Sequence, residues 1–243
     1  ALEAGELRAM IDRTRFAIST EETRYYLNGI YLHAAERDGT PLLRAVATDG
    51  HRLASVELPL PEGAAGMPGV IVPRKTVTEL RKLIDETVDS IAIALSETKI
   101  RFSFEGAQLT SKLIDGTFPD YDRVIPAGND RILECDCRQF AEAVDRVSAI
   151  STEKSRAVKL ALGKGGLVLS ANSPDNDTAT EELAVAYEGA EMEIGFNARY
   201  LLDIVSQIEG DTARFLLADA ASPTLIRDPS DEGALYVLMP MRV

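Results

Sequence analysis

The sequence is short of the residues that build metal and redox sites. Its 243 residues include no tryptophan, two histidines and two cysteines. Cys135 and Cys137 are separated by a single residue, a spacing that disfavours a disulfide between them, and no further cysteine is present to complete a zinc site. His33 and His51 are too few for most histidine-based metal centres. We therefore expect no metal and no cofactor.

The sequence also lacks the long apolar run and the motifs that define several other protein classes. No stretch of about 18 apolar residues could cross a membrane, and the N-terminus has no basic segment followed by an apolar one that would indicate export. The GxSxG, HExxH and GxxxxGK(S/T) patterns are absent. The GKGG stretch at 163–166 lies between two strand patterns and predicts a hairpin turn rather than a phosphate-binding loop. The sequence therefore predicts a cytoplasmic protein that is not an enzyme.

Nearly the same eight residues occur twice, as AISTEETR at 17–24 and AISTEKSR at 149–156. Such a match in so short a chain indicates an internal duplication. Before each copy, mostly apolar residues recur at i, i+3, i+4 and i+7, the spacing of one face of an α-helix. The two stripes are Leu7, Met10, Ile11 and Thr14, and Phe140, Ala143, Val144 and Val147. A short apolar strand that runs into a helix also occurs twice, at 71–84 and 194–208, so each repeat is predicted to contain two helices.

Between and after these helices, apolar and polar residues alternate with period 2. SIAIAL, KIRFSF and AQLTSKLI in the first half, and GLVLSA, RFLLA and ALYVLM in the second, are typical of half-buried strands joined by turns. We therefore predict an α+β fold of two duplicated domains, each with two helices packed on antiparallel sheets. The boundary is predicted in FPDYDRVIPAGND, where prolines, a glycine and a break in periodicity coincide, so the domains comprise residues 1–125 and 126–243.

Two motifs have both a structural and a functional interpretation. ATDGHRLA at 47–54 joins two strand patterns through an Asp-Gly turn, and its functional interpretation places His51 and Arg52 at a surface. The chain ends in YVLMPMRV at 236–243. Its methionines either fill gaps in the core or form the adaptable thioether surface of a peptide-binding site.

Taken together, the motifs resemble the bacterial DNA sliding clamp, the beta subunit of DNA polymerase III. The resemblance rests on the duplicated unit and on ATDGHRLA, VPRKTVTEL at 72–80, FPDYDRVIP at 118–126 and YVLMPMRV, in that order along the chain. It implies the DNA clamp fold, with the chain corresponding to the second and third of three similar domains. It also implies a processivity factor of DNA replication, in which two full-length subunits form a homodimeric ring around duplex DNA without sequence preference. The chain by itself is then expected to be monomeric.

The resemblance further implies a peptide-binding pocket between the two domains, used by polymerases, the clamp loader and repair proteins. Its expected ligand is a short extended segment with a Gln followed by Leu or Phe. The pocket residues carried over by motif are Leu27, Thr48, Gly50, His51, Arg52, Leu53, Pro119, Arg123, Val124, Asn197, Tyr200, Ala221, Pro223, Met239, Pro240, Met241 and Arg242. Ala221 and Pro223 depart from the branched aliphatic residue and the serine of better-known relatives, which leaves the shape of that pocket wall open.

The distribution of charge bears on DNA binding, because phosphate contacts dominate the affinity of proteins for DNA. The chain has a net charge of −13, yet the four predicted helices together carry +1 and the remainder carries −14. If the helices line a ring, as in the family, a near-neutral to basic lining lies within an acidic exterior; alternatively, the acidic exterior only aids solubility. The candidate DNA-facing residues are Arg24, Tyr25, Tyr26, Arg74 and Lys75. Their structural interpretation is a half-buried strand edge and a solvated helix start.

Two other classes of function stay open at this point. The chain could be an acidic protein-interaction scaffold without a DNA function, or an unrecognised hydrolase built on duplicated domains. Salt-dependent, sequence-independent binding to DNA favours the clamp. Catalytic turnover that is lost when one carboxylate is mutated favours the hydrolase.

Overall fold

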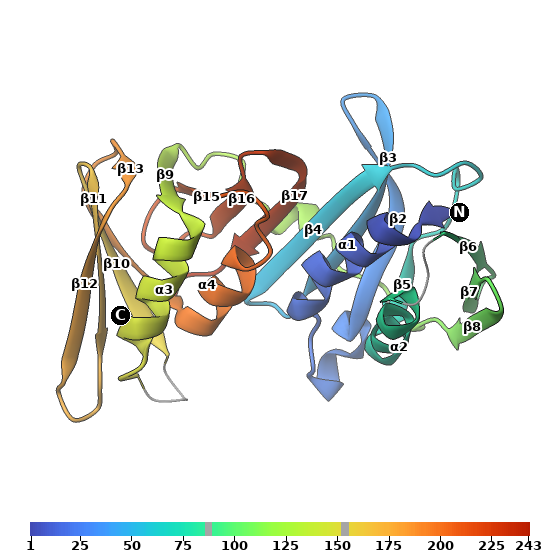
Figure 1. Cartoon of the computed structure of the whole chain (residues 1–243), viewed down its shortest axis with the longest axis horizontal. Helices are drawn as coiled ribbons and strands as arrows, with labels where there is room; N and C mark the ends of the chain where they lie inside the picture. The colour runs from blue at the N-terminus through green and yellow to red at the C-terminus, as the bar shows by residue number, and fades with distance from the viewer. Residues whose placement is uncertain (86–88, 152–155) are drawn as a thin grey trace. The chain divides into compact units, whose positions relative to one another are not determined.

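The chain folds into two compact units. The computed structural model describes residues 1–85, 89–151 and 156–243. Unit 1 comprises Ala1–Asp120 and unit 2 comprises Tyr121–Val243. Each unit combines antiparallel sheets with α-helices, as Figure 1 shows, so the predicted α+β class is confirmed.

Unit 1 contains helices α1 and α2 and two sets of strands. Its elements are β1 (Leu2–Glu3), α1 (Ala4–Thr14), the 3-10 helices η1 (Arg15–Ala17) and η2 (Glu22–Leu27), β2 (Gly29–Arg37), β3 (Thr40–Thr48), β4 (Arg52–Pro59), β5 (Val70–Pro73), α2 (Arg74–Asp85), β6 (Ser90–Leu95), β7 (Lys99–Phe104) and β8 (Ala107–Lys112). One sheet has the order β1-β6-β7-β8, and the other strands are hydrogen-bonded in the order β4-β3-β2-β5. All of these pairings are antiparallel.

Unit 2 repeats this plan. Its elements are η3 (Tyr121–Val124), β9 (Arg131–Asp136), α3 (Cys137–Ser148), β10 (Ala157–Gly163), β11 (Gly166–Asn172), β12 (Thr178–Ala184), β13 (Ala186–Tyr187), β14 (Met192–Asn197), α4 (Ala198–Val205), β15 (Thr212–Leu217), β16 (Thr224–Asp228) and β17 (Asp231–Leu238). One sheet has the order β12-β11-β10-β14, and the other strands follow the order β13-β9-β15-β16-β17. In each unit the two helices are neighbours, since α1 contacts α2 and α3 contacts α4.

The predicted apolar stripes are the buried faces of the helices. All four stripe residues of α1 are buried, as are all four of α3. In α4, Leu201, Ile204 and Val205 are buried, and the helix ends at Val205. Ile208, the last residue of the predicted strand-and-helix segment 194–208, lies beyond that end. The amide of Gly210 is bound there to the Asp228 carboxylate at 2.9 Å, so the chain turns away before another helical turn can form.

The duplicated octapeptide follows the first helix in unit 1. Its first copy begins at Ala17 of η1 and continues into η2. In the second copy, Ala149 caps α3, while residues 152–155 lie outside the described part of the chain. The GKGG stretch forms the turn between β10 and β11, with Gly165 at a φ of 73°. The prediction of a hairpin turn there is confirmed.

The two cysteines are ordinary free thiols. Burial raises the pKa of Cys135 to about 12. Burial, together with the nearby Asp136 carboxylate, raises the pKa of Cys137 to about 11. At neutral pH both groups are protonated and therefore poorly nucleophilic. None of the helices within the described ranges has the length and apolar character needed to span a bilayer.

Candidate functional site

The turn between β3 and β4 is built by its own polar side chains. The Asp49 carboxylate accepts hydrogen bonds from the amides of His51, at 2.9 Å, and Arg52, at 3.1 Å. The Thr48 hydroxyl donates to the carbonyl of Arg52 at 2.7 Å. Gly50 has a φ of 88°, a left-handed conformation that glycine adopts without steric cost. The turn is therefore rigid, and it presents the exposed His51 at its tip.

Arg52 is held inside unit 1 rather than projecting from it. Its side chain is only 10% exposed and forms an ion pair with Asp49. The guanidinium also donates to the Phe16 carbonyl at 2.8 Å and lies over the Phe16 ring at 5.1 Å. Leu53 and Leu27, two further residues of the predicted pocket, are buried. These three residues are thus largely enclosed in unit 1, whereas His51 is exposed at the turn and Thr48 is half-buried.

Arg24 belongs to the same network. Its guanidinium forms two hydrogen bonds with the Glu21 carboxylate, at 2.8 and 2.6 Å, and a third with the Asp49 carbonyl at 3.1 Å. The hydrogen bond from Arg24 lowers the pKa of Glu21, and the same bond raises the pKa of Arg24. The structure therefore brings Arg24, expected to face DNA, against the turn that carries the predicted peptide-binding residues.

A separate pocket of about 410 Å³ gathers three of the other DNA-facing candidates. Tyr25, Arg74 and Lys75 line it together with Asn28 and Thr78. Tyr25 is 52% exposed and meets Tyr26 edge-on, with ring centroids 5.7 Å apart. Arg74 and Lys75 are both exposed and occupy the first turn of α2. A helix N-terminus attracts anions, so two cations at this position do not stabilise the helix and are better suited to binding a phosphate.

In unit 2, two predicted pocket residues lie at the start of α4. Asn197 is its N-cap, and its side-chain oxygen accepts a hydrogen bond from the Tyr200 amide at 3.3 Å. Both side chains are half-buried. The cap fixes the position of Tyr200 relative to the end of β14, because it satisfies an amide that the helix leaves without an internal partner.

The C-terminal residues are held against β14. The Met241 amide donates to the Gly195 carbonyl at 2.7 Å. A Cβ atom at Gly195 would collide with Val243, so glycine allows the close approach of the chain end. Met239 is 39% exposed and Met241 is half-buried. Of the two interpretations of this motif, the one that places Met239 in the core is wrong.

Most of the remaining candidates are exposed on η3 or in loops, whereas Pro223 and Pro240 are half-buried. Val124 is 49% exposed on η3, next to the exposed Arg123. Ala221 is exposed, and its amide donates to Asp219 at 2.8 Å. The Pro223 carbonyl accepts a hydrogen bond from Asn129 at 2.9 Å. Arg242 and, in unit 1, Pro119 are exposed as well.

Sequence reasoning recognised the Asp-Gly turn but did not include Asp49 among the site residues, although its carboxylate organises the turn. Its signal was present, since an aspartate that precedes glycine often accepts hydrogen bonds from amides two and three residues further on. Glu21 and Phe16 were not recognised either. Their contacts with Arg24 and Arg52 join segments of unit 1 that the motifs did not connect.

The comparisons with known proteins agree along the whole chain. A family model described as "DNA polymerase III beta subunit, central domain" matches residues 1–120, and one described as "DNA polymerase III beta subunit, C-terminal domain" matches residues 122–242. The beta sliding clamp of Caulobacter vibrioides is 57% identical over 243 residues, which are all of this chain and 65% of the relative. The beta sliding clamp of Pseudomonas aeruginosa is 42% identical over the same coverage.

Solved structures give the same result. The sliding clamp of Bartonella birtlesii bound to griselimycin has a TM-score of 0.96 and 56% identity, over 100% of this chain and 65% of that one. The Caulobacter crescentus beta sliding clamp with PEG bound has a TM-score of 0.97 and 57% identity at the same coverage.

These matches define the chain as a protein with the DNA clamp fold. More particularly, the chain belongs to the DNA polymerase III beta subunit family, and it contains that family's central and C-terminal domains. It spans about 65% of the length of the curated relatives it matches.

Proposed function

We propose that this chain serves as the central and C-terminal part of a replicative sliding clamp. In this role it takes part in encircling duplex DNA and tethers polymerases, the clamp loader and repair proteins, without catalysis of its own. The observation that carries the proposal is the match of consecutive beta-subunit family models to residues 1–120 and 122–242. A protein with this role works on the bacterial chromosome, so we assign it to the cytoplasm.

The family assignment does not support the two other classes of function. Relatives at 57% and 42% identity are named beta sliding clamps, and neither a scaffold without DNA nor a hydrolase is among these names. Within the described part of the chain, no group of three or more His, Cys, Asp or Glu side chains could hold a metal ion. The clamp is therefore the function that we carry forward.

We further propose that the seventeen residues carried over by motif bind a short extended peptide of partner proteins. Support comes from the chemistry of the exposed members. Met239 and Val124 present apolar surface, and thioethers adapt to different ligands. Burial of each apolar anchor of the peptide contributes about 1.5 to 3 kcal/mol before ordering costs.

The test of the peptide proposal is Met239→Ala. We expect this variant to bind a polymerase-derived peptide containing Gln-Leu more weakly by about 1 to 3 kcal/mol, because a contact of the ligand is lost. Since Met239 is exposed, the melting temperature should stay close to that of the parent chain. Calorimetric titration measures the affinity, and a thermal melt measures the stability.

Ile132→Ala is the matched control for that experiment. Ile132 is 47% exposed in unit 2 and is not among the predicted pocket residues. Its truncation should leave the affinity unchanged. Equal peptide affinity in Met239→Ala and the parent chain would remove the methionine from the proposed site.

We also propose that the pocket at the start of α2 faces DNA. Arg74 and Lys75 supply charge for phosphates, and Tyr25 supplies an exposed aromatic ring. Arg24 stays a candidate, but its ion pair with Glu21 must loosen before it can reach a phosphate. For this reason Arg74 and Lys75 are the better residues to test.

The double variant Arg74→Ala/Lys75→Ala should bind a random-sequence duplex more weakly, and equally so for different sequences. The slope of log K against log salt should fall by roughly 2, about 0.9 for each lost phosphate contact. Lys99→Ala/Lys112→Ala removes the same charge from exposed positions of unit 1 outside its helices, on β7 and β8, and should leave the slope nearly unchanged. Fluorescence anisotropy across a salt series distinguishes the two pairs, and identical slopes would contradict the assignment.

A further inference from the structure

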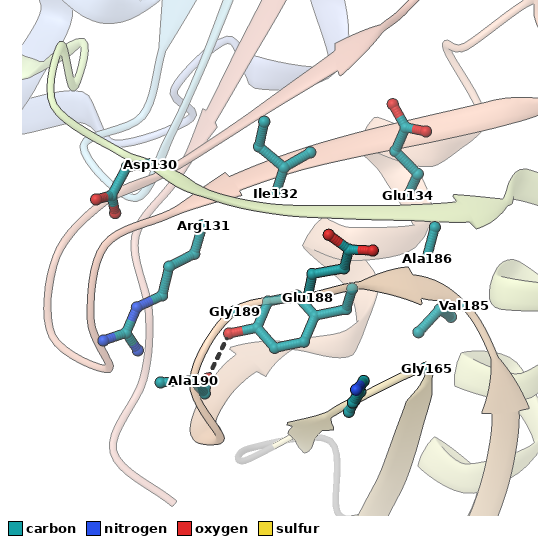
Figure 2. Close-up of a pocket in the computed structure, with 12 residues that line it drawn as sticks. Asp130, Arg131, Ile132, Glu134, Gly165, Val185, Ala186, Glu188, Gly189 and Ala190 are labelled. Carbon is teal, nitrogen blue, oxygen red and sulfur yellow. Dashed lines mark hydrogen bonds between the residues drawn. The ribbon is translucent and has the colours of Figure 1, made fainter.

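A groove of about 910 Å³ lies along β9 in unit 2, between that strand and the segment around β13 (Figure 2). Asp130 and Glu188 line it together with Arg131 and Lys164. Charges of both signs are mixed there, so the groove favours neither an acidic nor a basic ligand. Charges with a defined arrangement lie instead in unit 1, beside the turn between β3 and β4.

An ion pair at the start of η2 holds this turn from outside. Arg24 donates from Nε and Nη2 to the two carboxylate oxygens of Glu21, at 2.8 and 2.6 Å, and Nη2 also donates to the Asp49 carbonyl at 3.1 Å. The side chains of Arg24 and Glu21 are 33% and 51% exposed. Exposed ion pairs usually contribute little, but a bidentate pair of arginine and carboxylate is an exception because two parallel bonds fix the plane of the guanidinium. Glu21 therefore sets the direction in which Arg24 meets the turn.

The guanidinium also packs directly against Gly50. A Cβ atom at Gly50 would lie 2.5 Å from Nη1 of Arg24, so the missing side chain leaves the space that the guanidinium occupies. Gly50 and its neighbour His51 are both among the residues proposed to bind the peptide. Arg24 thus contacts the backbone at the part of the turn that the ligand is expected to meet.

The peptide plane between Asp49 and Gly50 is held at both of its polar groups. The Gly50 amide donates to the Thr48 hydroxyl at 3.2 Å, and the Asp49 carbonyl accepts from Arg24. Glycine adopts positive and negative φ about equally, so the φ of 88° at Gly50 is not fixed by the residue's own preference. Arg24 selects the orientation of this plane in which the carbonyl points at the guanidinium.

We infer that Glu21 and Arg24 are positioning residues for the peptide-binding turn. Glu21 orients the guanidinium, and the guanidinium holds the peptide plane that presents Gly50 and His51. This inference rests on the proposed binding of a partner peptide by the residues carried over by motif. A turn that is held in place before the ligand arrives does not have to be ordered on binding, so the pair raises the affinity without touching the peptide.

The test is a double-mutant cycle on the affinity of the 243-residue chain for the polymerase-derived peptide containing Gln-Leu. Arg24→Ala and Glu21→Ala should each weaken binding about fivefold, the cost of ordering one more group during binding. The double variant should bind no more weakly than Arg24→Ala, because Glu21 acts only through Arg24. Arg24→Lys keeps the charge but not the planar fork, so it should bind like Arg24→Ala.

Glu22→Ala is the matched control, since it removes the same charge from the neighbouring exposed position and should bind like the parent chain. A direct contact between Arg24 and an acidic group of the ligand predicts the opposite sign for Glu21→Ala, because the variant frees the guanidinium and strengthens binding. Calorimetric titration measures these affinities.

Amide NMR spectra without peptide give a second measurement. The Gly50 and His51 signals should be displaced in Arg24→Ala and Glu21→Ala, while the melting temperatures stay close to that of the parent chain. Unchanged or tighter binding by Glu21→Ala, or undisturbed Gly50 and His51 signals, would overturn the inference while the parent chain still binds the peptide. A parent chain that does not bind the peptide would overturn the proposed pocket itself, and this inference with it.

Discussion

Asp228 is a carboxylate held inside unit 2 by the turn that follows it. It accepts hydrogen bonds from the Ser230 hydroxyl at 2.6 Å, the Ser230 amide at 2.8 Å and the Gly210 amide at 2.9 Å. Burial by itself raises the pKa of this carboxyl, but these hydrogen bonds outweigh burial and lower the pKa below 3.8. The charged form is therefore the form that the fold stabilises.

This network predicts a pH dependence. Because the folded pKa lies below the unfolded value, the stabilisation from Asp228 is fully present above about pH 4 and is lost as the pH falls through the folded pKa. Asp228→Asn should lower the free energy of unfolding at pH 7 by about 1 to 3 kcal/mol. Its difference from the parent chain should shrink as the pH drops below 4. Urea denaturation at several pH values measures both effects.

Asp175→Asn is the control for that series. Asp175 is exposed on the turn between β11 and β12, and its substitution should change stability little at any pH. If the Asp228→Asn difference stayed constant from pH 7 to pH 3, the role of the charge would be contradicted.

At the scale of elements, α3 and α4 each begin with a side-chain N-cap, whereas α1 does not. Asp136 caps α3, accepting a hydrogen bond from the Gln139 amide at 2.8 Å, and Asn197 caps α4. Glu3 occupies the equivalent position before α1 but forms no side-chain cap. Both caps are short polar residues, the types preferred at this position.

The caps predict that removing the side chain that precedes the first helix lowers the free energy of unfolding more in unit 2 than in unit 1. Asp136→Ala should lower the free energy of unfolding by about 1 kcal/mol, because the Gln139 amide loses its acceptor. Glu3→Ala removes a carboxylate from the matching position of α1 and should cost much less. Chemical denaturation followed by circular dichroism compares the two variants, and equal losses would show that the Asp136 bond contributes nothing.

At the scale of the whole molecule, charge and length bear on DNA binding. The four predicted helical segments are close to neutral and the remainder of the chain carries −14, so few phosphates can be neutralised at once. Family resemblance implies that ring closure involves a third domain, and residues 1–243 match the models of two domains. Sliding on DNA without dissociation is therefore not expected of this chain by itself.

We expect residues 1–243 to sediment as a monomer. Binding to duplex DNA should be weak, with a Kd no tighter than about 10⁻⁴ to 10⁻⁶ M at physiological salt, as for non-specific binding. Analytical ultracentrifugation and anisotropy titrations measure these properties. A stable dimer that stays on closed-circular DNA would contradict the expectation.

Local patterns in the sequence were sufficient for the α+β class and for much of the architecture. The stripes of α1 and α3 became their buried faces, and the period-2 segments became strands, because burial of apolar side chains follows the geometry of each element. The turn at GKGG followed from glycine and its flanking strands. The motifs also led to the family, since they are specific as a set.

Only the tertiary structure decided how individual side chains are used. Arg52 binds Phe16, 36 residues away, and Arg24 binds the turn at Asp49, so two cations that the motifs assigned to ligands also hold the fold together. The exposure of Met239 likewise depends on contacts between distant segments. Periodicity records which face of an element is buried, but it does not record which residue from another segment meets it.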